Sequence, residues 1–513
     1  MTSLATPALA EATRPVAPAA PAFGLERLIG LLGVLLAVLV AGINEGVTRI
    51  AMADIRGAMF IGADEASWLI AWYSASSVAA MAFAPWFAVT LSLRRFTLGA
   101  ISVFVALALL CPLAPNQESL LVLRMLQGLA AGCLPPMLMT VALRFLPPPI
   151  KIFGLAGYAL TATFGPGLGT PLAALWVEYF NWQWTFWQVI PPCLVAMLAI
   201  SHGIVQDPPR LERLRRFNWR GLLLGLPAIV MTVLGLLQGN RLDWFESSLI
   251  SWLLGGGLVL MGLFLVSECF VEVPFFNLRL LAGGNLSHAL LTLAGVLVVL
   301  SAVASIPSAY LAQVHGYRPL QTAPLTLLVA LPQLLVLPLV AALCNIRRVD
   351  CRWVLCLGLL LLGLHCALAM QMTSAWIRDN FYLLQVLQVF GQPMAVLPLL
   401  IQSTSGIAPP DGPFASAWFN TVRGLSTALA TGLLEVLTTR REHFHSTHLV
   451  DRLGNAPWLA AGENTQALAR RLHEQAVVLT SADLYYCMGW LAVALILLIP
   501  VMTRRVYPPR ASN

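Results

Sequence analysis

Long apolar runs, separated by short polar segments, dominate the chain. A membrane-spanning helix needs about 20 mostly apolar residues, and the chain contains a series of runs close to that length. Several carry Gly or Pro, which spanning helices tolerate when neighbouring helices satisfy the freed backbone groups. The pattern predicts an all-α membrane protein with fourteen transmembrane helices. We place them at residues 27–48, 66–90, 97–114, 119–143, 151–175, 185–205, 220–238, 248–267, 286–312, 322–344, 353–372, 380–402, 413–437 and 483–503.

Composition and charge support a membrane environment. The 513 residues are 58% hydrophobic and only 10% charged, whereas a soluble domain carries about 25% charged residues. The net charge of +7 could suggest a nucleic-acid partner, but most basic residues lie in short segments on the side that also holds both termini. This positive-inside distribution predicts a multi-pass membrane protein that contacts lipid, has both termini in the cytoplasm and has no nucleic-acid partner.

The segments outside the apolar runs differ in character. Residues 1–24, rich in Ala and Pro, are predicted to be a disordered tail rather than a signal peptide, and residues 506–513 a second cytoplasmic tail. The basic stretch 206–220 is typical of an amphipathic surface segment near anionic lipid headgroups. Residues 440–482 form a long outer loop, with a predicted helical part at Thr465–Val478.

Polar residues inside the apolar runs are the candidates for function. A charge at the bilayer centre costs roughly 2.5–3.5 kcal/mol and must face a partner or a wet cavity. The first candidates are Asn44 and Glu45. Because a carboxyl group in an apolar cleft can bind and release a proton near neutral pH, Glu45 is a candidate proton carrier. The alternative is that Glu45 lies at the outer interface, solvated or paired with Arg49.

Two further groups follow the same logic. Arg124 and Gln127 lie three residues apart and so share a helix face; the alternative to a functional role is an arginine that extends to the membrane surface. Asn420 and Arg423 are also three apart, in a run that carries Glu435 as well. Their alternative is a structural hydrogen bond between helices.

The run 157–171 is unusually rich in Gly and Pro. It contains Gly157, Gly165, Pro166 and Gly169. This density predicts a kinked helix with a flat face on which a neighbouring helix can slide.

These residues and their spacing resemble the major facilitator superfamily, and most closely its fourteen-span drug:proton antiporter family of the EmrB type. Arg124 with Gln127 resembles motif B in the fourth span. The glycines of the run 157–171 resemble motif C, the antiporter signature of the fifth span. Asn420 with Arg423, and the long loop after them, match the family layout.

Two features depart from the family pattern. The acidic motif of the first span normally carries an aspartate, and here Asn44 and Glu45 compete for that place. The inner loop between spans two and three keeps Arg94 and Arg95 but lacks the family's aspartate, which implies a weakened gate latch or one located elsewhere. The corresponding loop of the second half keeps Asp350 among arginines.

The resemblance, which covers about residues 27–505, implies the major facilitator fold with two six-helix bundles and two extra central helices. The expected divisions are an N-terminal bundle at 25–205, the basic loop with the two extra helices at 206–284, and a C-terminal bundle at 285–505 that includes the loop 440–482. The superfamily's substrate site lies between the halves, and one half rocks against the other to expose it alternately.

The function that the resemblance implies is proton-coupled export of small amphiphilic molecules or drugs across a bacterial inner membrane. A proton from outside would neutralise Glu45, break its pairing with Arg124 and bias the swing of the halves. The alternative is a dedicated exporter of an endogenous metabolite or siderophore, acting as the inner-membrane component of a tripartite efflux assembly. The loop 440–482 would then contact a periplasmic adaptor protein that leads to an outer-membrane channel.

Enzyme motifs and metal sites are not expected. The chain has no nucleotide-binding loop, no HExxH and no GxSxG, and its nine cysteines include no CxxC pair. His443, His445 and His448 have a spacing that could ligate zinc, but no fitting Cys or acidic ligand lies nearby. We therefore favour a solvated polar loop there, and predict neither a metal nor a cofactor.

Overall fold

The computed structural model describes residues 24–147, 150–283, 285–405, 407, 411–455 and 464–502. These residues are mostly helical and contain no strand, which confirms the predicted all-α fold. The predicted tails, apart from Gly24, lie outside the described residues.

Twelve helical segments in the described part of the chain are long and apolar enough to cross a membrane. Two more long helices, α7 (Lys151–Tyr179) and α17 (Gly412–Asn455), coincide with the fifth and thirteenth predicted spans but are not among the twelve. Gly, Thr and Pro residues lower the hydropathy of α7, and a polar second half lowers that of α17. The count of fourteen spans therefore stays a prediction.

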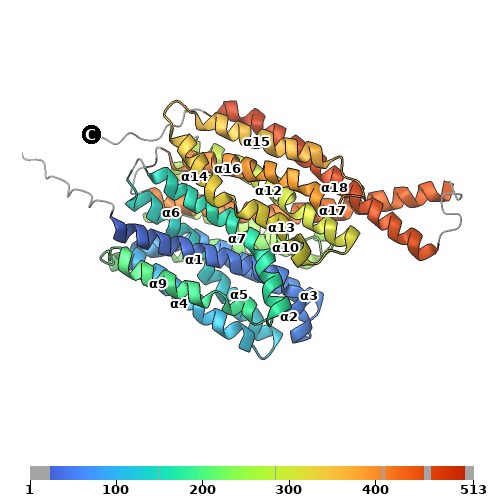
Figure 1. Cartoon of the computed structure of the whole chain (residues 1–513). Coiled ribbons are helices and arrows are strands. Elements are labelled where there is room, and N and C mark those ends of the chain that lie inside the picture. Colours follow the sequence, from blue (N-terminus) through green and yellow to red (C-terminus); the bar gives the residue numbers. More distant parts are fainter. Residues whose placement is uncertain are drawn as a thin grey trace, which may run out of the picture.

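The N-terminal helices, coloured blue to green in Figure 1, lie together and run roughly parallel or antiparallel to one another. We call the end of the bundle at which α1 begins the inner end, because the predicted orientation places it in the cytoplasm. Besides α7, these helices are α1 (Leu25–Ile50), α2 (Met52–Met59), α3 (Ala63–Leu91), α4 (Leu93–Leu110), α5 (Gln117–Gly132), α6 (Leu134–Phe145), α8 (Trp184–Trp187) and α9 (Ile190–Gly203).

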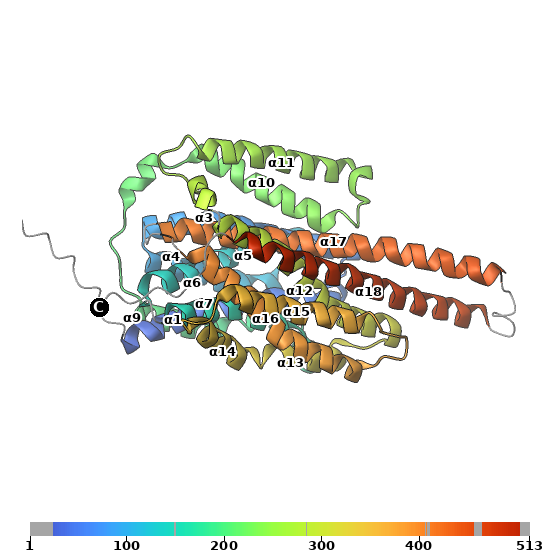
Figure 2. The same ribbon diagram turned by 90° about the horizontal axis from the view of Figure 1, so that it is seen from above.

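A short 3-10 helix, η2 (Leu211–Arg216), leads from α9 to α10 (Trp219–Gln238) and α11 (Ser248–Glu268). Figure 2 shows α10 and α11 side by side on one flank of the molecule. α10 contacts both α3 and α17, so it touches the N-terminal and the C-terminal helices at once.

The C-terminal helices, yellow to red in Figure 1, form the other part of the bundle. Besides α17, they are α12 (Asn285–His315), α13 (Pro319–Ala330), α14 (Gln333–Asn345), α15 (Cys351–Ala369), α16 (Tyr382–Thr404) and α18 (Thr465–Leu498).

The segment 440–482 is more helical than the long outer loop that the sequence predicted, and its predicted helical part, Thr465–Val478, lies within α18. α17 stays helical to Asn455 and α18 begins at Thr465, so most of the segment belongs to two long helices. They extend past the rest of the bundle as a two-helix hairpin (Figures 1 and 2). Asp483 of α18 accepts hydrogen bonds from Arg441 and from His445 of α17, the latter at 2.7 Å, which joins the two helices at the base of the hairpin.

Prolines inside the helices leave carbonyl groups without their usual donors, and side chains replace some of them. Pro393 of α16 has no N–H for the carbonyl of Val389. The buried side chain of Gln333 donates a 3.0 Å hydrogen bond to that carbonyl. The need to give this carbonyl a hydrogen-bond donor explains why the polar residue Gln333 occurs in an apolar run.

Large apolar side chains cover the outer faces of the helices. Leu198 of α9, Trp252 of α11, Leu335 of α14 and Leu497 of α18 are all exposed. An apolar surface of this extent is unfavourable in water, and lipid is the solvent that it fits.

Candidate functional site

The glycines of α7 bring it into close contact with α1. A Cβ atom on Gly169 would lie 2.9 Å from the carbonyl carbon of Gly46, and one on Gly165 would lie 3.4 Å from that of Gly42. A Cβ atom on Gly46 would in turn lie 3.7 Å from the Cα atom of Pro166. The flat face predicted for the run 157–171 is thus the surface on which α1 packs, and α1 is the helix that carries Asn44 and Glu45.

Gly157 takes little part in this contact. A Cβ atom there would meet only the side chain of Leu35, at 3.9 Å. Of the three glycines selected from the sequence in α7, Gly157 therefore has the most space for a side chain.

Glu45 is half-buried and makes two polar contacts. Its Oε1 atom accepts hydrogen bonds from Arg49 at 3.0 Å and from Ser74 of α3 at 3.2 Å. The pairing with Arg49 that the sequence left open is present. The expected pairing with Arg124 is not among the ion pairs of the described residues, although the two charges are near enough to interact electrostatically.

Arg124 is buried, so it does not extend to the membrane surface. Its guanidinium group lies 4.0 Å from the ring centroid of Tyr73 and 5.7 Å from that of Phe186. Its Nη1 atom donates a 2.8 Å hydrogen bond to Oε1 of Gln127, three residues on. No carboxylate lies within ion-pair distance of this cation in the described part of the chain, so aromatic faces and one amide oxygen stabilise its charge.

Several buried polar atoms around Arg124 lack hydrogen-bond partners of good geometry among the described residues. They are both side-chain atoms of Asn44, the hydroxyl of Tyr73, Nε of Arg124 and Nε2 of Gln127. Such groups are costly in a low-dielectric interior unless they are used in another state or by a ligand. The cluster combines α1, α3 and α5 and holds a net positive charge.

Asn420 and Arg423 meet one residue, Tyr158 of α7. The Tyr158 hydroxyl donates a 2.6 Å hydrogen bond to Oδ1 of Asn420. The guanidinium group of Arg423 lies 5.4 Å from the centroid of the Tyr158 ring. The amide group of Asn420 donates to the Ser416 carbonyl at 2.8 Å, which fixes its orientation. The two polar residues of the thirteenth span thus contact the fifth.

Glu435 lies farther along α17, on an exposed face. It is near enough to Arg49 for an electrostatic interaction. Arg49 therefore stands between two carboxylates, Glu45 on its own helix and Glu435 from the C-terminal half.

The predicted gating residues lie apart from this cluster, at the inner end. Arg94 donates a 3.4 Å hydrogen bond to the Ile204 carbonyl, and Arg95 is exposed. Asp350 is the N-cap of α15 and accepts hydrogen bonds from the backbone and the side chain of Arg352.

A second set of contacts fastens the segment after α9 to the N-terminal helices. Asp207 accepts two hydrogen bonds from Arg144 of α6, the longer at 3.0 Å. The backbone N–H of Arg210 donates to the Thr90 carbonyl at 2.8 Å. Asp207 is thus an acidic partner for an arginine at the inner end, whereas the loop that carries Arg94 has no acidic residue of its own.

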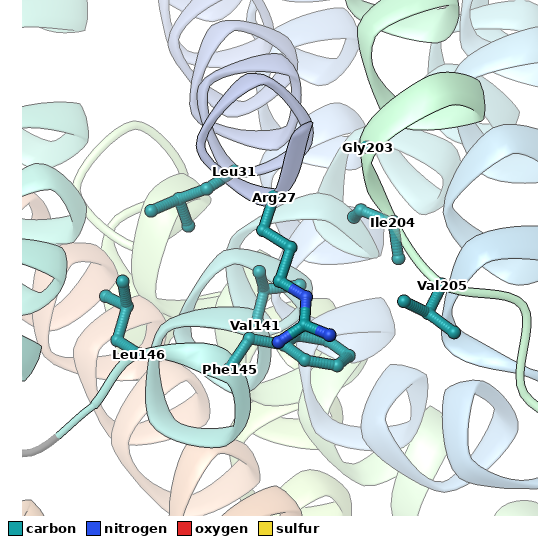
Figure 3. A pocket seen from close by; sticks show the side chains of 8 residues that line it. All are labelled: Arg27, Leu31, Val141, Phe145, Leu146, Gly203, Ile204 and Val205. Carbon is teal, nitrogen blue, oxygen red and sulfur yellow. The ribbon is translucent and has the colours of Figure 1, made fainter. Parts of the chain in front are cut away.

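A small pocket lies near these contacts, between α1, α6 and α9. Figure 3 shows the Arg27 side chain reaching from α1 toward Phe145, with apolar side chains around it. The pocket has one cationic residue and lies at the inner end, away from Glu45 and Arg124.

Two tyrosines of the site were not selected from the sequence. Tyr73 covers the guanidinium group of Arg124, and Tyr158 links α7 to α17. The sequence did carry a signal, because the hydroxyl group of a tyrosine inside an apolar run needs a hydrogen-bond partner. Which partner each tyrosine meets depends on helix packing, which spacing along the chain does not reveal.

Comparisons with known proteins agree on the family. Residues 34–343 match the family model described as Major Facilitator Superfamily. The chain is 25% identical over 418 residues to the probable multidrug resistance protein EmrY of Escherichia coli (strain K12), which covers 79% of each protein. It is 22% identical over 482 residues to the multidrug export protein EmrB of the same strain, covering 92% of this chain and 90% of EmrB.

A solved structure supports the fold. The crystal structure of the human organic anion transporter MFSD10 (TETRAN) aligns with a TM-score of 0.59 and 14% identity, over 92% of this chain and 100% of that one. At this identity the likeness concerns the fold alone.

Proposed function

Because the chain belongs to the major facilitator superfamily, we propose that it exports small amphiphilic molecules or drugs in exchange for protons, by alternating access. Its apolar helices and bacterial exporter relatives indicate a multi-pass inner-membrane protein. The names of EmrY and EmrB support drug export as the direction of transport. The substrate site of such an exporter is apolar with few fixed polar groups, which suits amphiphiles.

The proposal rests on how two charged residues of the N-terminal half are paired. Arg124 is buried with no carboxylate at ion-pair distance in the described residues, while Glu45 pairs with Arg49 at 3.0 Å. An unpaired charge in a low-dielectric site is costly. Glu45 therefore has two alternative cationic partners, one at the outer end of α1 and one inside the bundle.

Protonation of Glu45 would weaken both of these pairings, so the proton can decide which arrangement is preferred. A deprotonated Glu45 is attracted toward Arg124, and a protonated one is released from it. If each arrangement goes with a different opening of the halves, proton entry biases the swing. One proton that crosses 100 mV supplies about 2.3 kcal/mol for this purpose.

The test is transport by Glu45→Gln and Arg124→Ala in vesicles with an imposed pH gradient. We expect substrate movement driven by the gradient to be lost in both, with substrate binding retained in Glu45→Gln. Glu118→Gln removes an exposed carboxylate from the first turn of α5 and serves as the matched control. Unimpaired substrate–proton exchange in both site variants would exclude this mechanism.

The hairpin of α17 and α18 favours a second candidate function, in which the protein is the inner-membrane component of a tripartite assembly that exports an endogenous metabolite or siderophore. The hairpin extends beyond the bundle at the outer end (Figure 2). It offers a surface to a periplasmic adaptor protein and, through it, an outer-membrane channel. Deletion of 446–472, which leaves Arg441, His445 and Asp483 in place, should abolish adaptor recovery in a pull-down; unchanged recovery would refute the assembly role.

A further inference from the structure

The segment between α9 and α10 places apolar and basic side chains in separate rows. In a 3-10 helix residues three apart lie above one another. Within η2 this places Arg213 over Arg216, and Leu211 over Leu214. Arg213 and Arg216 thus form one row and the two leucines another, while Arg215 shares the third row with Glu212. A search for α-helical periodicity does not detect this pattern.

The row of leucines is left uncovered. Leu211 is 54% exposed and Leu214 is 43% exposed. Phe217, at the next position of the same row, is instead held by the bundle, because its ring packs on Trp86 of α3 at 4.9 Å. One end of the apolar row is therefore anchored to protein, and the rest faces outward.

The arginines of the segment have few acidic partners. Arg216 pairs with Glu272 at 3.1 Å, but both groups are largely exposed. Arg210, Arg213 and Arg215 form no ion pair within the described residues. Desolvation, together with the charge of Arg210, lowers the pKa of the Arg213 guanidinium group. An anion beside Arg213 would offset that cost.

Aromatic side chains indicate the depth at which the segment lies. Trp219 at the start of α10 is 67% exposed, and Phe270 just after α11 is 85% exposed. Aromatic rings of this kind favour the boundary between headgroups and acyl chains. Figure 2 shows the segment passing outside the helix bundle at the inner end on its way to α10. Residues 209–213 line an open hollow in its surface.

We propose that η2 and its flanking residues bind anionic phospholipid, with Arg210, Arg213 and Arg215 on the headgroup phosphates and Leu211 and Leu214 among the acyl chains. Basic residues beside spanning helices are attracted to the anionic inner leaflet, and the apolar row explains why the partner is a lipid and not a soluble anion. Binding here would hold α10 and α11 at a fixed depth beside α3.

The experiment measures binding of fluorescent phosphatidylglycerol to the detergent-solubilised full chain, with unlabelled lipids as competitors. Each basic residue near an anionic surface accounts for about fivefold in association, so R210Q/R213Q/R215Q should weaken binding about a hundredfold. The control R440Q/R452Q/R470Q removes the same charge from α17 and α18 at the outer end, and should change binding by less than about twofold.

Further arms separate lipid from other anions. L211Q/L214Q keeps every charge and should weaken phosphatidylglycerol binding several-fold. Phosphatidylcholine and glycerol phosphate should compete poorly with the labelled lipid. The proposal is overturned if the triple variant binds like the wild type, or if glycerol phosphate displaces the lipid as well as phosphatidylglycerol does. Thermal unfolding in neutral lipid should differ little between the variants, since every substituted side chain of the segment is at least partly exposed.

Discussion

The Tyr158 hydroxyl donates a 2.6 Å hydrogen bond to Oδ1 of Asn420, and this contact joins α7 of the N-terminal half to α17 of the C-terminal half. Ser416, one turn before Asn420, donates a 3.2 Å hydrogen bond to the carbonyl of Pro136 in α6. Both contacts lie toward the inner end, so separation of α17 from α6 and α7 at that end must break them.

Tyr158→Phe should therefore favour the conformation that is open at the inner end. The substitution removes one buried hydrogen bond and leaves Oδ1 of Asn420 without its donor, at a cost of about 1–3 kcal/mol. This corresponds to a shift of the conformational equilibrium by about 5-fold to 150-fold. Pulsed dipolar distances between spin labels on α7 and α17 would report it. Tyr486→Phe, at an exposed position of α18, is the control; identical distance distributions for all three proteins would contradict the prediction.

Alanine substitutions at the glycines of α7 should have larger effects on stability and transport the closer the glycine lies to α1. Gly169→Ala places a methyl group 2.9 Å from the Gly46 backbone, and Gly157→Ala places one 3.9 Å from a leucine side chain. Overpacking against backbone costs about 1–3 kcal/mol, so Gly169→Ala should lower the melting temperature and impair transport. Gly157→Ala should do neither. Melting curves in detergent and uptake into vesicles would check the order, and equal effects at the two positions would show that the α1–α7 contact is not the constraint.

The hairpin should depend on Asp483. Its carboxylate accepts hydrogen bonds from Arg441 and His445 of the opposite helix. Asp483→Asn removes the charge from a partly exposed network, which we expect to cost about 1 kcal/mol. Amide hydrogen exchange at 441–455 and 465–482 should rise several-fold, with little change in the bundle. Glu474→Gln removes a carboxylate that pairs with the exposed Arg470 within one helix, and should leave exchange unchanged. The reverse ranking would count against this role for Asp483.

The sequence was sufficient for the fold class because apolar length is a direct physical requirement of the bilayer. It also located the charged residues that lie inside the runs. It predicted a helical part at Thr465–Val478, which lies within α18, but it did not predict the hairpin. Residues 440–455 and 465–482 are too polar to resemble spans, and the contact that joins the two helices links Arg441 to Asp483, far apart in the sequence. The period of hydrophobicity carries no information on such pairs.

The site was predicted as a set of residues and not as a geometry. Spacing placed Gln127 beside Arg124 because both lie on one helix. The partner of Glu45 is a harder problem, since its charge interacts with both Arg49 and Arg124, and the sequence does not show that Arg124 lies beyond ion-pair distance. Tyr158 became visible as a partner of Asn420 only when α7 and α17 were placed side by side.

Two substitutions at Arg124 give the sharpest prediction, because the variant that is more stable should be the one that transports less. A charge at membrane depth costs roughly 2.5–3.5 kcal/mol, and the Tyr73 ring and Gln127 offset this by about 1–3 kcal/mol each. Arg124→Gln removes the charge together with these contacts, so the melting temperature should stay within a few degrees of the wild type. Arg124→Lys keeps a charge that is more strongly hydrated and cannot lie flat on the Tyr73 ring, and should be the less stable variant.

Transport driven by a pH gradient should rank the same proteins the other way. Arg124→Lys retains a cation that can attract Glu45 and should keep measurable exchange, whereas Arg124→Gln leaves Glu45 only its pairing with Arg49 and should lose at least tenfold. A stable but inactive Arg124→Gln protein means that the buried charge is kept for function at a cost in stability. An unstable Arg124→Gln protein would instead make Arg124 a structural residue, whose contacts with Tyr73 and Gln127 stabilise the junction of α3 and α5.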